Sequence, residues 1–345
     1  MTGHLRVLMG GPMLSVQDLG RPGYLSNGLS RGGAADRLAL VEGAALLGQG
    51  AGLAAIEMAG YGGTFEALRD MRIALTGAPM KAKVDDQALV WNAVQIIRAG
   101  QRVSIGAANK GLYGYLHVGG GIASKPILGS QSFHMVAGIG GPIETGCVLP
   151  VGMDAKTHSV GLRLPVSDRF SGGTVRVTPS AQTFRFSKSE RERFEGTQFV
   201  RTAHGNRQGV KLAFEGSPFV AEGQLSVLSE VMVPGDIQMT GDGSPFVLLP
   251  ECQTTGGYPR IGTVLPQDLP IVAQTAPGAQ LNFSFVSLEQ ALETAQRPVQ
   301  MLADLGRRIQ PLIRDPRDIP DLLSYQLIGG MTAGKELSEE GNGGW

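Results

Sequence analysis

The stretch PFVLLPECQTTGGYPRIGTV, residues 245–264, is the most informative part of the chain. A short apolar run leads into a loop built around a Gly-Gly pair, and a β-branched segment follows it. A plain connection between two strands needs only about two to five residues of the Gly, Asn, Asp or Pro type. This loop also carries a carboxylate, a thiol, an amide, two hydroxyls, a phenol and a guanidinium. It therefore predicts a strand–loop–strand unit whose loop has a binding or catalytic role.

The rest of the chain has the composition of a turn-rich β protein. Charged residues make up 17% of the 345 residues, and Gly occurs 51 times. Such a composition suits strands and tight turns better than a helical bundle. Short apolar segments bounded by Gly, Asp or Pro predict strands at 5–9, 72–75, 88–91, 102–105, 112–118, 174–178, 199–201, 226–232 and 280–286. We expect a mainly β fold with few helices.

Helices are predicted at a few places. Residues 33–48 have apolar side chains on one helical face and a natural stop at Gly48. Ser187, with Glu190 three positions later, has the spacing of a helix start.

The segment 164–174 mixes Pro, Ser and Gly and predicts an inter-domain joint. We expect β subdomains at 1–168 and 169–287, followed by an appendage at 288–345 with helices at 288–296 and 298–309 and a frayed end.

Charge and cysteine content exclude several classes of function. Lys plus Arg and Asp plus Glu both total 30, so no charge bias indicates nucleic acid or an anionic membrane. No apolar run approaches the roughly 20 residues of a membrane span, and the N-terminal residues lack the features of a signal peptide. The two cysteines form no disulfide framework. We expect a cytoplasmic protein that binds neither nucleic acid nor membrane.

Four loops place polar side chains beside glycines, which let a backbone approach a ligand closely. They are the opening loop, the Gly-rich segment 119–132, the segment 16–24, and the turn at 205–209, which is followed later in the chain by Gln238. The candidate site residues in them are Gln17, Asp18, Arg21, Asn206, Arg207, Gln238, Gln253, Thr254, Thr255 and Tyr258. Each group has a structural alternative. The first three would brace a turn, Asn206 and Arg207 would form a surface turn, and Gln253 with its threonines would satisfy backbone groups.

Other motifs give weaker signals. The five histidines have no metal-ligand spacing, so no metal site is predicted. His117 lies in a strand-like run typical of a core histidine, whereas His204 lies beside a candidate turn. No His or other base follows Cys252 at a spacing that indicates a nucleophilic cysteine. The segment 329–336 matches a phosphate loop except that Glu336 replaces the hydroxyl that binds magnesium, which argues against that motif.

Several segments together resemble the biotin-dependent carboxyltransferase-like family, also described as allophanate hydrolase subunit 2 or urea amidolyase-related. The resemblance runs from about residue 5 to 290, and its longest piece is 229–278, which contains the opening loop. The shorter pieces are VQDLGRPGY at 16–24, GGAADRLAL at 32–40, AAIEM at 54–58, IALTGAP at 73–79, GYLHVGGGI at 114–122, LGSQS at 128–132 and NRQG at 206–209. Two positions depart from the common pattern of the family. They are Lys211, where Arg is usual, and Glu251, where Asp is usual.

The resemblance implies two cyclophilin-like β-barrel subdomains and a multi-subunit enzyme. Standalone bacterial members include the C subunit of an ATP-dependent 5-oxoprolinase, which opens the lactam of 5-oxoproline to give glutamate. The implied partners are a smaller subunit and a lactam-opening subunit, and ATP with magnesium would act in the complex. The chain has no Met-Lys-Met tripeptide for attaching biotin. Two alternatives stay open: a carboxyltransferase component of a biotin-dependent urea or amide carboxylase, and a non-catalytic regulatory subunit.

The chemistry of such substrates matches the candidate residues. Urea and 5-oxoproline share an N–H attached to a C=O, and Gln, Asn and Thr side chains supply the complementary acceptors and donors. Arg207, Gln253, Thr254 and Thr255 are expected to act at the reacting amide. Arg207 would face the negative charge that develops on its oxygen. Asn206, Gln238, Tyr258, Gln17, Asp18 and Arg21 are expected to bind substrate, and the small amide or lactam would lie between them.

Overall fold

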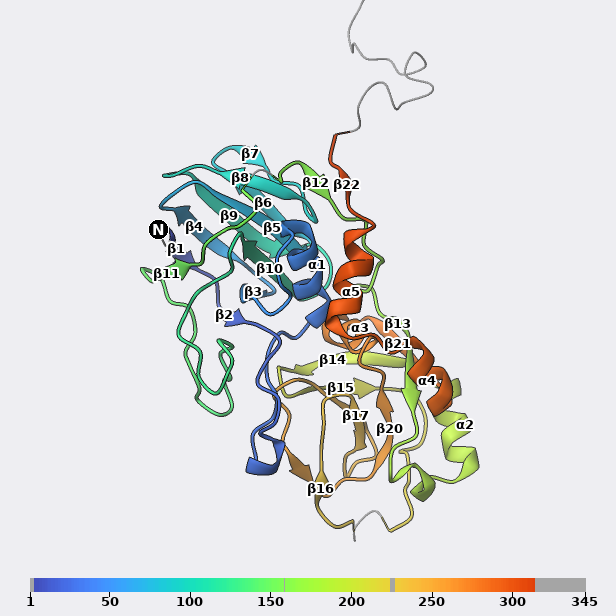
Figure 1. Cartoon of the computed structure of the whole chain (residues 1–345). Coiled ribbons are helices and arrows are strands. Elements are labelled where there is room, and N and C mark those ends of the chain that lie inside the picture. The colour runs from blue at the N-terminus through green and yellow to red at the C-terminus, as the bar shows by residue number, and fades with distance from the viewer. Residues whose placement is uncertain (1–2, 158, 224–226, 314–345) are drawn as a thin grey trace, which may run out of the picture.

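The computed structural model describes residues 3–157, 159–223 and 227–313, and it is mainly β, as predicted (Figure 1). Figure 1 shows two β-rich halves, one above the other, with α1 and α5 lying side by side where the halves meet. In the described segments, no helix combines the length and the apolar character that a membrane crossing requires.

The first half contains two antiparallel sheets that enclose one apolar core. Side chains from both sheets, among them Leu5, Ile56, Phe65 and Leu116, form that core and are fully or almost fully buried. The larger sheet has the order β11-β1-β4-β9-β6-β7, with β1 Gly3–Gly10, β4 Gly63–Ala67, β6 Met80–Val84, β7 Gln87–Ala88, β9 Arg102–Ala108 and β11 Val148–Val151. The smaller has the order β2-β3-β10-β5-β8, with β2 Leu14–Gln17, β3 Ala55–Ala59, β5 Met71–Gly77, β8 Val94–Ile97 and β10 Tyr113–Val118.

The second half is a closed barrel. Its strand order is β13-β20-β17-β18-β15-β14-β21, and it closes through a parallel pairing of β13 with β21. Phe194, Phe199 and Phe283 pack together in its core, with ring centroids 5.0–5.5 Å apart. The strands are β13 Gly173–Thr178, β14 Phe199–Gly205, β15 Gly209–Ala213, β17 Asp236–Met239, β18 Pro245–Leu248, β20 Arg260–Val264 and β21 Gln280–Phe285.

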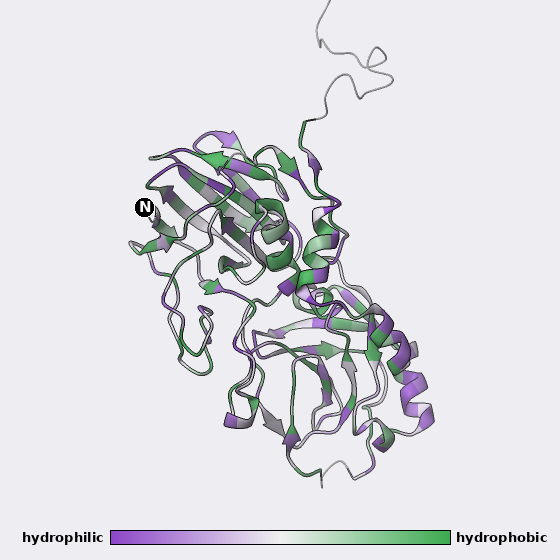
Figure 2. Cartoon of the chain, in the orientation of Figure 1, coloured by the Kyte–Doolittle hydropathy of each residue, from purple (hydrophilic) through white to green (hydrophobic). Residues whose placement is uncertain are grey.

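Five α-helices surround these sheets in the described segments, at α1 Arg37–Leu47, α2 Lys188–Gly196, α3 Leu269–Gln274, α4 Leu288–Thr294 and α5 Pro298–Gly306. The apolar α1 packs against β5 and β10, while the hydrophilic α2 lies on the outside of the barrel (Figure 2). Residues in short 3-10 turns and two-residue strands complete the fold, at Leu25–Asn27, Thr183–Arg185, β12 Leu162–Arg163, β16 Glu230–Val231, β19 Thr255–Gly256 and β22 Gln310–Pro311.

The C-terminal helices confirm the prediction for 288–309, and they also return to the first half. Leu305 of α5 is buried against α1, together with Leu46 and Val41. Beyond α5, β22 pairs with β12. Part of the segment expected as an appendage is therefore packed across the junction.

Two predicted elements differ from the structure. The strand expected at 88–91 ends at Ala88, because the backbone N–H and carbonyl oxygen of Val90 bond the Gln95 side chain and not a neighbouring strand. The next strand begins only at Val94. The helix expected from residue 33 begins at Arg37, where the Asp36 carboxylate accepts a hydrogen bond from the Ala39 N–H. Predicted strand 226–232 is described only in part, and β16 covers two of its residues.

Candidate functional site

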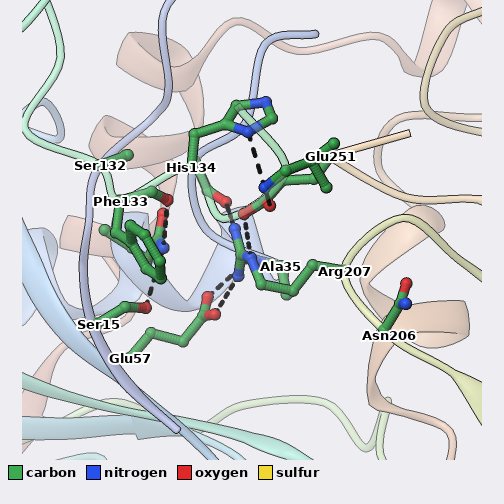
Figure 3. Close-up of polar contacts among 12 residues, drawn as sticks. Ser15, Ala35, Glu57, Ser132, Phe133, His134, Asn206, Arg207 and Glu251 are labelled. Carbon is green, nitrogen blue, oxygen red and sulfur yellow. Dashed lines mark hydrogen bonds and ion pairs between the residues drawn. The ribbon is translucent and has the colours of Figure 1, made fainter. Parts of the chain in front are cut away.

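Arg207 occupies the centre of a buried charge network between the two halves. It follows β14 in the turn to β15, and only 4% of its surface is exposed. Its Nε donates to Glu251 at 2.5 Å, one Nη donates to Glu57, and the other Nη donates to the carbonyl oxygen of Gly33 (Figure 3). Two carboxylates compensate the cost of burying one guanidinium and raise its pKa.

Glu57 is held in place by the first half. It lies on β3, and its second oxygen accepts from the backbone N–H of Ala35 at 2.8 Å and from the hydroxyl of Tyr115 at 2.7 Å. Burial, reinforced by the Glu57 carboxylate, raises the pKa of Tyr115 well above its usual value. The phenol therefore remains a hydrogen-bond donor to Glu57.

Glu251 links the opening loop to the segment of the first half that carries His134 and Val136. One Glu251 oxygen lies 3.7 Å from His134 Nδ1 and 3.3 Å from the backbone nitrogen of Val136, which donates to it. The other ring nitrogen of His134 lies 3.0 Å from Ser30 Oγ. Burial lowers the pKa of His134, although the Glu251 carboxylate opposes that effect. We infer that the imidazole is neutral at pH 7, and its Nδ1 accepts from the Ala137 N–H at 3.2 Å. The hydrogen bond that reaches Glu251 is therefore the one from the Val136 N–H.

The Asp18 carboxylate accepts four hydrogen bonds, which agrees with the structural alternative for this residue. They come from Ser130 Oγ at 2.6 Å, Ser132 Oγ at 2.5 Å, the Gln131 N–H at 2.7 Å and the Gly20 N–H at 2.8 Å. Four donors satisfy both oxygens of an ionised carboxylate. Asp18 therefore fastens the long loop after β10 to the segment after β2.

Arg21 and Gln17 are also buried, but each keeps one polar atom without a partner among the described residues, namely Arg21 Nη1 and Gln17 Oε1. Arg21 Nη2 donates to the carbonyl oxygen of Ser132 at 2.5 Å, and Gln17 Nε2 donates to that of Phe133 at 3.0 Å. Arg21 lines a small cavity of about 130 Å³ that Lys125 also lines. These residues can present a cationic donor to a small polar group.

The opening loop presents a different set of groups. Gln238, on β17, accepts at Oε1 from Gln253 Nε2 at 3.1 Å. The carbonyl oxygen of Thr254 accepts from the Met232 N–H at 2.9 Å, and Thr255 lies in β19, which pairs with β16. Among the described residues, neither threonine hydroxyl of this loop has a hydrogen-bond partner.

The predicted site residues therefore fall into three groups. Gln17, Asp18 and Arg21 lie together in the first half, Arg207 lies in the central network, and Gln238, Gln253, Thr254, Thr255 and Tyr258 belong to the opening loop and its neighbouring strand. Asn206 lies apart from the network, exposed, with its Oδ1 accepting from the Gln208 N–H at 2.7 Å (Figure 3). That contact is the turn predicted as the alternative for Asn206.

The position of Arg207 calls for a different role from the one expected. Its guanidinium faces Glu57 and Glu251, which already neutralise its charge, so it is poorly placed to meet negative charge on a substrate. We interpret it as a positioning residue that fixes the start of the opening loop. The clearest signal for this network in the sequence was Glu57, a carboxylate inside the apolar run AAIEM. No comparable local signal marked His134, Ser130 or Ser132.

The weaker candidates are also placed by the structure. His117 is a core residue, as predicted, since it is buried and lies 2.8 Å from Thr76 Oγ1. His204 is exposed on β14. Cys252 is buried, and burial with the nearby Asp236 carboxylate raises the pKa of its thiol to about 12, so it does not supply a thiolate at neutral pH. The segment 329–336 lies outside the described residues.

Comparison with known proteins identifies the family. The family model described as "Carboxyltransferase domain, subdomain A and B" matches residues 27–285. The chain belongs to this carboxyltransferase-domain family. Proteins with similar sequences include the C subunit of 5-oxoprolinase from Escherichia coli (strain K12), 33% identical over 310 residues that cover 88% of this chain and 98% of that protein. Another is the C subunit of 5-oxoprolinase from Haemophilus influenzae, 33% identical over 298 residues that cover 86% of this chain and 95% of that protein.

A solved structure shows the same fold. The Kluyveromyces lactis urea carboxylase structure superposes with a TM-score of 0.77 and 21% identity, covering 91% of this chain and 31% of that one. The resemblance stated from sequence is therefore confirmed for both the family and the mainly β fold.

Proposed function

We propose that this chain is a subunit of an ATP-dependent 5-oxoprolinase, which hydrolyses the lactam of 5-oxoproline to glutamate. The observation that carries the proposal is the share of each relative's length that this chain matches. The chain spans 98% of the C subunit of the Escherichia coli 5-oxoprolinase at 33% identity, but only 25% of a putative urea carboxylase from Emericella nidulans, at 25% identity. A whole-length match supports the same kind of standalone subunit.

We place the lactam at the amide pair of the opening loop. The Gln253–Gln238 hydrogen bond leaves Gln253 Oε1 as an acceptor and Gln238 Nε2 as a donor, neither with a partner among the described residues. A lactam presents its N–H and C=O on the same side of the ring, and these groups complement one acceptor and one donor. The hydroxyls of Thr254 and Thr255 add further donors, and Tyr258, 45% exposed, would cover the ring.

The remaining predicted residues support this loop in the proposal. Arg207 positions the loop through Glu251. Asp18 holds the loop after β10 that carries His134. Gln17 and Arg21 each have one polar atom with no partner in the described part of the chain, and we keep them as candidates for a second contact to the substrate. ATP with magnesium and the lactam-opening step are assigned to the assembled complex, which would include a smaller partner subunit and act in the cytoplasm.

A carboxyltransferase component of a biotin-dependent urea or amide carboxylase is the second candidate. The family description and the sequence similarity to the putative urea carboxylase of Emericella nidulans favour it. In that reaction the same amide pair would hold the nitrogen that accepts the carboxyl group. A purely regulatory subunit is a third possibility, in which the amide pair binds its ligand without turnover.

Reconstitution separates the three candidates. The purified chain is combined with its partner subunits, and phosphate release from ATP and glutamate formation are measured with 5-oxoproline or urea present. We expect glutamate to form only with 5-oxoproline and only when all subunits are present. Turnover that needs a biotinylated protein and urea would assign the carboxyltransferase role. Full turnover by the partners without this chain would assign the regulatory role.

A further inference from the structure

A pocket lies where α1, α3 and α5 meet, and none of its described lining residues belongs to the opening loop. Its volume is about 410 Å³, which is within the usual range for small-molecule sites. Figure 1 shows that these three helices converge at the junction of the two halves. The apolar part of the wall comes from both halves and from the C-terminal helices, through Leu19, Leu38, Val41, Pro266, Pro270, Pro298 and Met301.

The charged part of the wall is entirely cationic. Arg31, Arg37 and Arg297 line the pocket, and no Asp or Glu does so among the described residues. Arg31 Nε donates to the carbonyl oxygen of Leu19 at 2.9 Å, which orients its guanidinium. Arg37 Nε has no hydrogen-bond partner in the described part of the chain.

Arg31 and Arg37 also repel each other electrostatically. Burial, and then the like charge of Arg31, lower the pKa of Arg37 to about 10. Buried cations in proteins are normally paired with a carboxylate, so a half-buried pair of guanidiniums without one is unusual. The acids close to the pocket make no hydrogen bond to Arg31 or Arg37 among the described residues. Asp268 binds Arg176 at 2.6 Å. Burial lowers the pKa of Arg31, and the Asp18 carboxylate, which is held by the serines of the loop after β10, only partly opposes that effect.

We propose that this pocket binds a small organic anion, with a carboxylate or phosphate group between Arg31 and Arg37 and an apolar portion against Leu38, Val41 and Met301. A guanidinium recognises either anionic group through paired N–H donors. Arg297, which is exposed at the rim, would add a third cation. The bound anion would pair directly with both guanidiniums, which no carboxylate of the described residues does, and it would tie α1 and α5 to α3. This inference is independent of the proposed reaction at the opening loop.

Binding to the purified full chain tests the proposal directly. Isothermal titration calorimetry is run with inorganic phosphate, ATP, glutamate and 5-oxoproline, which separates phosphates from carboxylates. 2-Pyrrolidone, the lactam without a carboxylate, is the neutral control. We expect at least one of the anions to bind with a stoichiometry of one, and Arg37→Gln and Arg31→Gln each to weaken it by about tenfold or more, the loss expected for one charge-assisted hydrogen bond.

Control variants show whether the anion binds in this pocket. Arg6→Gln removes an exposed arginine on β1, 2.8 Å from Glu66, and should leave the affinity unchanged. Gln253→Ala should leave the affinity for inorganic phosphate and ATP unchanged, because that side chain belongs to the opening loop, where only 5-oxoproline and its product are proposed to bind. Without ligand, Arg37→Gln should raise the melting temperature, since it removes an unpaired charge, whereas a structural role for Arg37 would lower it. The proposal is overturned if no anion binds at millimolar concentration, if Arg37→Gln binds like the wild type, or if the unliganded variant is less stable.

Discussion

Arg207 of the second half is hydrogen-bonded to Glu57 of the first half, 150 positions earlier in the chain, inside the junction between them. The same guanidinium binds Glu251, at the start of the opening loop. One buried cation therefore joins the β3 strand, the β14–β15 turn and the opening loop. The stability of the two halves and the position of the loop depend on the same three side chains.

Removing Arg207 should destabilise the protein strongly. In Arg207→Met, Glu57 and Glu251 lose their shared partner in a buried site, and breaking such a network typically costs about 3–5 kcal/mol of unfolding free energy. Urea unfolding followed by circular dichroism measures the loss. Adding Glu57→Gln to Arg207→Met should restore part of it, because one uncompensated carboxylate is removed.

An exposed ion pair provides the control for this experiment. Arg6→Gln breaks the ion pair of Arg6 with Glu66. The Arg6 side chain is 46% exposed, so the change should lower the unfolding free energy by under about 1 kcal/mol. A comparable loss in Arg6→Gln and Arg207→Met would contradict the buried-network interpretation. So would a double variant that is less stable than Arg207→Met alone.

The elements of the fold were predictable where the signal is local. Seven of the nine predicted strands fall on observed ones, and Ser187 caps α2 by accepting from the Glu190 N–H, because alternation and capping depend on neighbours in sequence. The prediction for strand 88–91 failed because it rested on apolar character, whereas the backbone of Val90 bonds the side chain of Gln95 and no neighbouring strand. The apolar pattern of 88–91 gives no sign of that side-chain contact.

The site was predictable in composition but not in arrangement. Polar residues beside glycines marked Asp18, Arg207 and Gln253, and all three make polar contacts in the structure. Sequence could not show that Arg207 faces two carboxylates, since Glu57 and Glu251 reach it only when the two halves pack together. The same reason hid the cationic pocket, because Arg297 and Pro270 meet Arg31 and Arg37 only in the folded chain.

Acid should destabilise the protein partly through His117. Burial lowers the pKa of this histidine to about 3, whereas an unfolded histidine titrates near about 6.5. Below pH 6.5 the unfolded chain therefore binds a proton that the folded chain does not. Stability is fully present above that pH and falls by up to about 1.4 kcal/mol per pH unit until the pH approaches 3.

Urea unfolding at pH 7.5 and 5.5 tests this contribution. The difference between the two pH values should be smaller in His117→Gln than in the wild type, because the variant has no titrating group at this position. His134, whose pKa is also lowered, contributes a remaining difference of the same sign. An identical pH dependence in wild type and variant would show that His117 takes up a proton in the folded state.

The two cysteines should differ in reactivity. Cys252 is buried and has a pKa of about 12, whereas Cys147 is partly exposed. A thiol-disulfide reagent at pH 8 should therefore modify one thiol quickly in the native protein and both after unfolding. Cys252→Ala should keep the activity of the reconstituted complex. Fast modification of Cys252 with parallel loss of activity would instead assign it a nucleophilic role.

The amide pair gives the most direct test of the proposed lactam site. Gln253→Ala removes the acceptor proposed for the lactam N–H, and Thr255→Ala removes an exposed hydroxyl of the same loop. We expect each to change the unfolding free energy by under about 1 kcal/mol, as for other truncations near the surface. The kcat/KM for 5-oxoproline in the reconstituted complex should fall by roughly 100-fold for Gln253→Ala, the scale of one lost transition-state hydrogen bond.

A second glutamine pair on the same barrel supplies the matched control for that experiment. Gln198 donates to Gln280 at 3.0 Å, the same chemistry as Gln253 with Gln238, but on an exposed surface away from the opening loop. Gln198→Ala should leave both stability and kcat/KM unchanged. If the opening loop is only braced by its amide pair, Gln253→Ala should instead lose about 1–3 kcal/mol of stability, the cost of an unsatisfied buried group, and retain activity per folded molecule. That pattern at both Gln253 and Thr255 would move the lactam site to Gln17 and Arg21, whose unpaired polar atoms offer the next set of contacts.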